Sequence, residues 1–509
     1  MVSLASLPDE VLKLVMQHVS LRDRLTSCCL VSKRLHAAAV SATDRLELDF
    51  TEDIHDYNLN AAARQPSSQW LCKYGQQLTS LYVSGLGWPL RELPCPNLQR
   101  LQLSDCAVQL GVAPGGLPSG IQQCTKLTQL QLWCNIIDAQ AGAVVEGLSS
   151  LVHLQHLHVH AKILFGVGVM MKYKTGGLSD ATLPRLQHLT YLNVQGLNPE
   201  NLQQLGGLTS LQRLNLDSAD NSAVGPSNAP GMAFPTSLKT VFLSSPVEAG
   251  VLSLLPADLQ DLRVECAVHG PAEGPGSFLC RMARLQHLTN LVVLPDGGVA
   301  WPPPGPAYSA LTASSSLVCL EMHDVILPEG IWSYVFPAGR KLPHLTCLVL
   351  HPQDEEEEGG VDQWPTAPSW GAADLCNLVS CCPSLRRVDV LHLQHGMHVS
   401  ELHKLTAFYA LNAYYATPDF HHMLDASMKG LAAVSQLRHL NITADQDWEA
   451  STLLTLTSLT NLRGFCLNAH DEDDNEYVGP KLELGTSQFA QVRTCGTHAS
   501  SPAGAGQAQ

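Results

Sequence analysis

The sequence is poor in charge, and it has no long apolar run. Asp, Glu, Lys and Arg make up 15% of its 509 residues, against about 25% in typical soluble domains. Thirty basic residues against 46 acidic ones give a formal net charge of -16. This balance argues against a nucleic-acid backbone as partner, because binding phosphates requires a basic surface. No uninterrupted apolar stretch approaches the ~18 residues of a membrane-spanning helix, so we expect no membrane partner.

Signals for export and for cysteine chemistry are also missing. The chain has 16 cysteines but no Cys-x-x-Cys pair, and its N-terminus lacks the basic and long apolar regions of a signal peptide. We therefore expect a protein of the cytoplasm, the nucleus or both. In those compartments cysteines stay reduced and act mostly as small buried apolar groups.

The common local motifs of catalysis are absent. The sequence contains no phosphate-binding loop, dinucleotide-binding glycine pattern, Gly-x-Ser-x-Gly elbow or His-Glu-x-x-His helix. We predict no catalytic residues, no cofactor and no metal ligands. Three histidines, His156, His158 and His160, alternate along one expected strand, but a strand spreads such side chains roughly 6.6 Å apart, whereas zinc requires ligands that converge.

What the sequence does contain begins with a helical segment near the N-terminus. Apolar residues from Leu7 to Val19 follow the three-and-four spacing of one buried helical stripe. A second helix is expected from about Leu21 and a third after Ser32. Three helices in about forty residues cannot enclose their own apolar surface, so we expect a partner or a neighbouring domain to cover the surplus.

This segment resembles the F-box family. The matching residues are Leu7, Pro8, Glu10, Leu12, Val15, Val19, Asp23, Leu25 and the run from Leu30 to Arg34. The sequence departs from the family at Leu35, where Trp is common. The resemblance implies that residues 1–42 form an F-box that binds a Skp-family adaptor and, through it, a cullin. The implied adaptor-binding residues are Leu7, Pro8, Glu10, Val11, Leu12, Val15, Val19, Leu25, Leu30, Val31 and Leu35. The alternative is a helical cap on the open end of a repeat array.

The rest of the chain is a repeat. The pattern Leu-x-x-Leu-x-Leu recurs from Leu46 onward, most copies lying roughly 20 to 29 residues apart, which is the leucine-rich-repeat period. It predicts an α/β solenoid, a leucine-rich-repeat horseshoe with a parallel concave sheet and about 14–16 repeats, over residues 43–485. Leucines at every third position upstream of several strands predict helical or 3₁₀ back segments, and Cys95 and Cys382 are expected in the core. Insertions are expected near 162–177 and 352–374, and a disordered tail over 486–509.

Residues between the strand leucines point to the opposite, concave face. This face is rich in aromatic and Arg side chains, which are enriched at the energetic centres of protein interfaces. We predict that it binds a protein target. The predicted substrate-binding residues are Tyr82, Arg100, Gln102, Trp133, His156, His158, His160, Tyr191, Asn193, Arg213, Asp217, Phe242 and Arg263.

The two parts together predict a non-catalytic substrate receptor of a Skp–cullin–F-box ubiquitin ligase. The F-box would bind the adaptor, and the repeats would hold an unidentified target protein. A different class stays open at this point, namely a leucine-rich-repeat scaffold or inhibitor protein whose N-terminal helices are only a cap.

Overall fold

The structure is a computed structural model, and the chain in it forms two compact units. Unit 1 is Met1–Ser245 with Leu254–Pro256, and unit 2 is Pro246–Ser253 with Ala257–Gln509. The described residues are 7–19, 23, 31–49, 71–84, 93–108, 119–136, 147–163, 183–195, 202–217, 231–266, 275–295, 305–323, 327–351, 372–390, 405–410, 429–444, 456–469 and 482–485.

Unit 1 begins with the helices α1 (Asp9–Gln17) and α4 (Lys33–Ser41). They confirm the first and third predicted helices, while the predicted second helix lies almost wholly outside the described residues. Pro8 stands at the N-cap of α1, where the carbonyl oxygen of Pro8 accepts the N–H of Leu12 at 2.9 Å. The hydroxyl of Ser32 accepts the N–H of Leu35 at 3.1 Å and so caps α4, as expected for Ser at that position.

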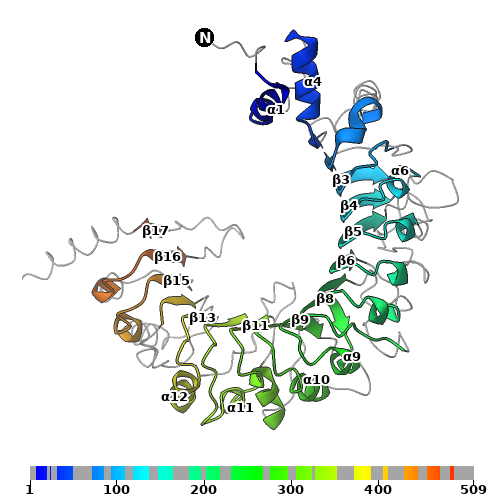
Figure 1. Ribbon diagram of the computed structural model, residues 1–509. Helices are drawn as coiled ribbons and strands as arrows, with labels where there is room; N and C mark the ends of the chain where they lie inside the picture. The colour runs from blue at the N-terminus through cyan, green and yellow to red at the C-terminus, as the bar shows by residue number, and fades with distance from the viewer. Residues whose placement is uncertain are drawn as a thin grey trace, which may run out of the picture. The chain divides into compact units, whose positions relative to one another are not determined.

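The strands of unit 1 run parallel from β1 to β8 (Figure 1). Short helical segments precede most of them. The strands are β1 (Arg45–Asp49), β2 (Ser80–Ser84), β3 (Arg100–Val108), β4 (Gln129–Ile136), β5 (His156–Ile163), β6 (Tyr191–Gln195), β7 (Arg213–Asp217) and β8 (Thr240–Val247). The helical segments are η4 (Gly75–Gln77), α6 (Ser119–Gln122), η5 (Gly147–Ser150), η6 (Leu183–Arg185) and η7 (Leu205–Gly207).

Unit 2 repeats the same plan, with parallel pairing from β9 to β16. Its strands are β9 (Asp261–Cys266), β10 (Asn290–Pro295), β11 (Cys319–His323), β12 (Cys347–His351), β13 (Arg387–Val390), β14 (Ala407–Ala410), β15 (His439–Ala444), β16 (Gly464–Ala469) and β17 (Leu482–Gly485). Its helical segments are α9 (Ala249–Leu254), α10 (Pro275–Met282), η8 (Pro306–Thr312), α11 (Trp332–Val335), α12 (Ala372–Cys381) and η10 (Leu456–Ser458).

The predicted strand leucines form the core. Leu130 on β4 is in register with Leu157 on β5, which is in register with Leu192 on β6, and all three are fully buried. The same position continues as Leu214 on β7 and Val241 on β8. Each leucine therefore packs between copies of itself in the neighbouring repeats. Together with the predicted N-terminal helices, this arrangement confirms the predicted solenoid.

The described back segments of unit 1 are mostly 3₁₀ helix, one of the two predicted conformations, and unit 2 contains both kinds. The N–H of Leu208 donates to the carbonyl of Leu205 at 3.0 Å, and the N–H of Leu211 donates to Leu208 at 2.9 Å. An i to i+3 hydrogen bond places every third side chain on one face. All of these leucines are buried, which explains their spacing of three. The predicted core cysteines Cys95 and Cys382 are buried as well, and burial raises the pKa of each thiol to about 12.

A threonine ladder also joins successive repeats, and sequence reasoning missed it. Threonine often stands just before a strand, directly after the preceding leucine. Its hydroxyl donates to a backbone carbonyl of the previous repeat, as Thr128 does to Gln99 at 3.1 Å and Thr190 does to Gln155 at 3.1 Å. The same bond is made by Thr79, Thr289, Thr346 and Thr406. The recurring Leu-Thr pair before a strand was the available signal.

One strand departs from the predicted parallel sheet, because the last strand, β17, pairs antiparallel with β16. Of the predicted insertions, residues 162–163 belong to β5 and residues 372–374 belong to α12. The remainder of both insertions, and the predicted tail at 486–509, lie outside the described residues. In the described part of the chain, no helix has the length and apolarity that crossing a bilayer requires.

Truncation of a buried strand leucine should destabilise the protein more than truncation of an exposed apolar residue of the same repeat. Leu157→Ala is expected to lower the free energy of unfolding by about 3 kcal/mol, because truncating a fully packed leucine leaves a cavity. The matched control is Val152→Ala, at a side chain that is 44% exposed. Urea denaturation followed by circular dichroism measures both, and equal shifts of the two midpoints would contradict the assigned packing of Leu157.

Candidate recognition surfaces

The first surface belongs to the helices α1 and α4. Leu12 and Met16 of α1 pack against Ala38, Ala39 and Ala42, with Val19 and Leu35 partly buried against them. The apolar residues of α1 therefore do not form one buried face as predicted, because residues 12 and 16 face α4 whereas residues 11 and 15 face outward. Leu12, a predicted adaptor-binding residue, is fully buried and supports the helix pair from inside.

The outward side of α1 is apolar. Val11, Leu14 and Val15 are exposed there, Leu14 by 59%, and Val31 just before α4 is 71% exposed. Leu14 was missed by the sequence analysis, although its spacing of three from Val11 places it on the same helical face. Three apolar side chains on one turn of a surface helix are unusual for a face that meets only water.

The other predicted adaptor-binding residues differ in their exposure. Pro8 and Glu10 are exposed, and Leu7 is partly exposed. Leu35, which stands where the F-box family commonly has Trp, contributes to the core of the pair and is only partly exposed. Leu25 and Leu30 lie outside the described residues.

Polar contacts join the two helices to each other and to the segment that precedes β2. Arg34 donates to the Asp9 carboxylate at 2.7 Å across the two helices. The Nε2 atom of His36 lies 2.9 Å from the hydroxyl of Tyr74, in the helical turn that precedes β2. Because α4 ends at Ser41 and β1 begins at Arg45, the helices join the first repeat through a very short connection.

The second surface is the strand face of unit 1, formed by the side chains that alternate with the buried leucines. Register puts them in rows that cross the strands. One row reads Arg100, Gln129, His156, Tyr191 and Arg213. The next row reads Tyr82, Gln102, Gln131, His158, Asn193, Asn215 and Phe242.

Aromatic rings gather at the centre of this face. The ring of Trp133, which is 43% exposed, lies 4.8 Å from that of His158 and 5.4 Å from that of His160. The ring of His156 lies 6.0 Å from that of Tyr191 on the next strand. We call these five residues the aromatic cluster. An exposed tryptophan supported by other rings is a typical anchor for a protein partner.

Two histidines of the cluster, His156 and His158, have lowered pKa values. Burial lowers the pKa of His156, and the guanidinium groups of Arg213 and Arg100 lower it further. Burial also lowers the pKa of His158, with a smaller effect from His160. Imidazoles whose pKa lies below the ordinary value of about 6.5 are mostly uncharged at neutral pH. This part of the face therefore presents neutral aromatic rings between two arginines.

A polar hollow of about 600 Å³ lies beside the cluster, over the first strands of unit 1. Tyr82, Arg100 and Gln102, which the sequence analysis predicted, line it together with Asp44, Arg45, Glu47 and Gln129, which it did not list. Arg45 and Glu47 lie on β1 and Gln129 lies on β4, where they alternate with the buried residues, so the repeat pattern contained the signal for them. Asp44 directly precedes β1.

The remaining predicted target-binding residues are more dispersed. Asn193 and Phe242 lie in the second row, and Arg263 is exposed on β9 of unit 2. Asp217 ends β7, and its side chain lies outside the described set. The structure thus brings together the histidines, Trp133 and Tyr191, with Arg100 and Arg213 beside them, and leaves Arg263 in the other unit.

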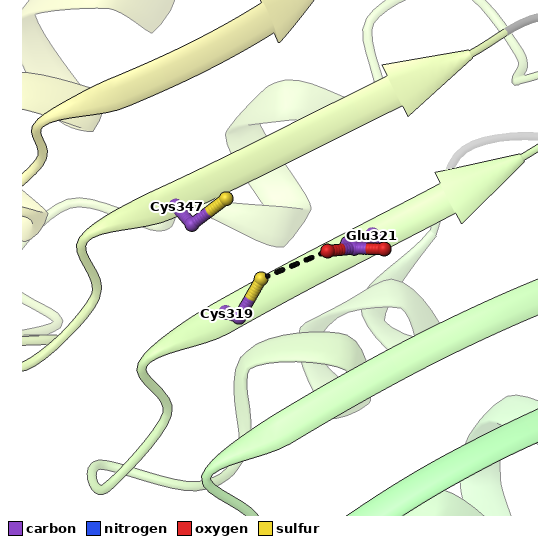
Figure 2. A group of neighbouring side chains, drawn as sticks. All are labelled: Cys319, Glu321 and Cys347. Carbon is purple, nitrogen blue, oxygen red and sulfur yellow. Dashed lines mark hydrogen bonds between the residues drawn. The ribbon is translucent and has the colours of Figure 1, made fainter. Parts of the chain in front are cut away.

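The strand face of unit 2 carries a group of a different kind. Cys319 and Cys347 stand in register on β11 and β12, and the Cys319 thiol donates to Glu321 at 3.2 Å (Figure 2). The neighbouring Cys347, burial and the Glu321 carboxylate raise the pKa of the Cys319 thiol. The neighbouring Cys319 and the guanidinium of Arg387 lower the pKa of Cys347.

A family model described as the F-box domain matches residues 4–43. No curated protein matches the sequence. Among solved structures, the chain is similar to an internalin (inlF) of Listeria monocytogenes str. 4b F2365, with 16% identity, a TM-score of 0.44 and coverage of 74% of this chain and 87% of the internalin. It is also similar to a leucine-rich-repeat protein of Leptospira interrogans, with 14% identity, a TM-score of 0.41 and coverage of 82% and 93%.

The buried strand leucines and the parallel strands define the larger part of the chain as a leucine-rich-repeat solenoid. The chain therefore combines an N-terminal segment that matches the F-box domain, residues 4–43, with a solenoid of leucine-rich repeats.

The lowered histidine pKa values predict a pH dependence of stability. The pKa values of His156 and His158 are lower in the folded protein than in the unfolded chain. As the pH falls below about 6.5, the unfolded chain therefore binds more protons than the folded protein does. The free energy of unfolding is highest above that pH and decreases as the pH falls through the lowered pKa values of the folded protein. Denaturant midpoints at about pH 7.5 and about pH 5.5 should differ less in His158→Gln than in the wild type. An identical difference in both proteins would remove this assignment.

Proposed function

We propose that this protein is the substrate-recognition subunit of a Skp–cullin–F-box ubiquitin ligase. F-box domains generally bind Skp-type adaptors, and the match at residues 4–43 carries the proposal. The exposed apolar side chains Val11, Leu14, Val15 and Val31 are the surface that the adaptor would cover. Assembly of such a ligase places the protein in the cytoplasm, the nucleus or both.

The repeats supply the target-binding part of the proposal. Trp133 is the anchor, because it is exposed, ring-supported and central on the strand face of unit 1. Arg100 and Arg213 flank the row that contains His156, which favours a target that presents carboxylates around an apolar side chain.

No chemistry by this chain is needed for this role. A receptor of this kind acts by holding a target near the conjugating enzyme, which raises the effective concentration of the target's lysines there. F-box domains and leucine-rich repeats are generally non-catalytic interaction modules, and the proposal assigns this chain no catalytic residue.

A non-catalytic scaffold or inhibitor protein is the competing function, with the helices acting only as a cap. The short connection from α4 to β1 suits a cap. The apolar outward face of α1 argues against a cap, because a cap normally presents a polar outer surface.

The adaptor surface is tested by a charge placed in its centre. Leu14→Asp combined with Val15→Asp is expected to abolish co-purification with a Skp-type adaptor and a cullin, because burying two unpaired carboxylates is strongly unfavourable. Val152→Asp, at a similarly exposed valine in the repeats, is the control and should retain both partners. Unchanged co-purification of the double variant would contradict the assigned surface, and absence of adaptor and cullin from the wild type would favour the scaffold.

The target surface is tested separately. Trp133→Ala should reduce capture of target proteins under proteasome inhibition about tenfold or more, because truncating an interface tryptophan commonly costs at least that much. Adaptor binding should be unchanged, since Trp133 lies on β4 and not on the helices. Quantitative mass spectrometry of the captured proteins, with Val152→Ala as control, measures both. Loss of the adaptor together with the targets would indicate general unfolding, and full retention of targets would exclude Trp133 as anchor.

A further inference from the structure

Two strands of unit 2 bring together side chains that are far apart in the sequence. Cys319 and Cys347 are directly opposite on β11 and β12. Glu321 stands two residues after Cys319 and therefore on the same face of its strand. Figure 2 shows the three side chains on that face, with the sulfur of Cys319 directed at the Glu321 carboxylate.

The distances suit a metal ion. One ligand atom from each of the three residues lies within 4.8 Å of the other two, and the Cys319 Sγ to Glu321 Oε1 distance is 3.2 Å. Tetrahedral zinc, with bonds of about 2.3 Å to sulfur and about 2.0–2.2 Å to oxygen, separates its ligand atoms by roughly 3.5–3.8 Å. The ligand atoms would therefore have to approach one another by about 1 Å at most to match the separations around tetrahedral zinc.

The surroundings are also suitable. All three side chains are partly buried. The second carboxylate oxygen of Glu321 lies 3.4 Å from Nε2 of His323, and ligating carboxylates typically have such a supporting hydrogen bond. Two thiolates and one carboxylate around a divalent cation carry one net negative charge. Arg387, the register neighbour of Cys347 on β13, reduces the cost of that charge.

The donor set selects the metal. Thiolates favour zinc and other thiophilic ions, whereas magnesium and calcium require oxygen ligands. We propose that Cys319, Cys347 and Glu321 bind a zinc ion on the strand face of unit 2. On binding, the two thiols release their protons to solvent and the carboxylate binds as the anion. Solvent occupies the fourth position of the tetrahedron. This site does not depend on the adaptor or target assignments.

Cobalt substitution tests the site in the full chain, kept reduced with a phosphine. One Co²⁺ per chain is expected to give thiolate-to-cobalt charge-transfer absorption and the strong visible bands of four-coordinate cobalt, and Zn²⁺ should displace it. The absorption should disappear in Cys319→Ser combined with Cys347→Ser, and Glu321→Gln should weaken binding about tenfold or more. Cys376→Ser, at an exposed free cysteine, is the matched control and should bind as the wild type does.

A second measurement requires no variant and so is unaffected by misfolding. Zn²⁺ should protect Cys319 and Cys347 of the wild type from alkylation, while Cys376 stays reactive, as read by peptide mass spectrometry. Equal alkylation of Cys319 and Cys347 with and without Zn²⁺ would overturn the proposal. Cobalt absorption that persists in the double serine variant would also overturn it, because the metal would then be bound elsewhere in the chain.

Discussion

The structure depends on the packing of each strand leucine between copies of itself in the neighbouring repeats. Leu130, Leu157, Leu192 and Leu214 occupy one such line, and none of them is exposed. A single repeat has no other element that could bury this side chain, so its stability comes from its neighbours. The threonine hydroxyls that cross from repeat to repeat, such as Thr128 to Gln99, follow the same spacing and add a polar link at the start of the strands.

The same register has a functional consequence on the opposite side of each strand. Once the leucines are aligned, the intervening residues are aligned too, and side chains separated by a whole repeat become direct neighbours. Trp133 meets His158 and His160 in this way in unit 1, and Cys319 meets Cys347 in unit 2. An aromatic anchor and a pair of thiols are different chemistries, yet both arise from one alignment that the apolar core enforces.

The N-terminal helices show where reasoning from a pattern reaches its limit. The spacing correctly predicted α1 and α4, and Ser32 correctly marked the start of α4. It did not separate the residues facing α4 from those facing outward, because a helix with apolar residues at both 11–12 and 15–16 has an apolar sector wider than one neighbour covers. Leu12 therefore proved to be core, and the unlisted Leu14 proved to be exposed.

Four features could be predicted from the sequence: the repeat, its period, the burial of Cys95 and Cys382, and the side of each strand on which the polar and aromatic residues lie. These follow from alternation along a strand and from local spacing, which are properties of neighbouring residues. Which of those residues come into contact depends on how distant segments of the chain pair. Three features depend on pairing between segments that are far apart in the sequence: the proximity of Cys319 and Cys347, the antiparallel β17, and the contact of Trp133 with two histidines. No local sequence pattern encodes such a register.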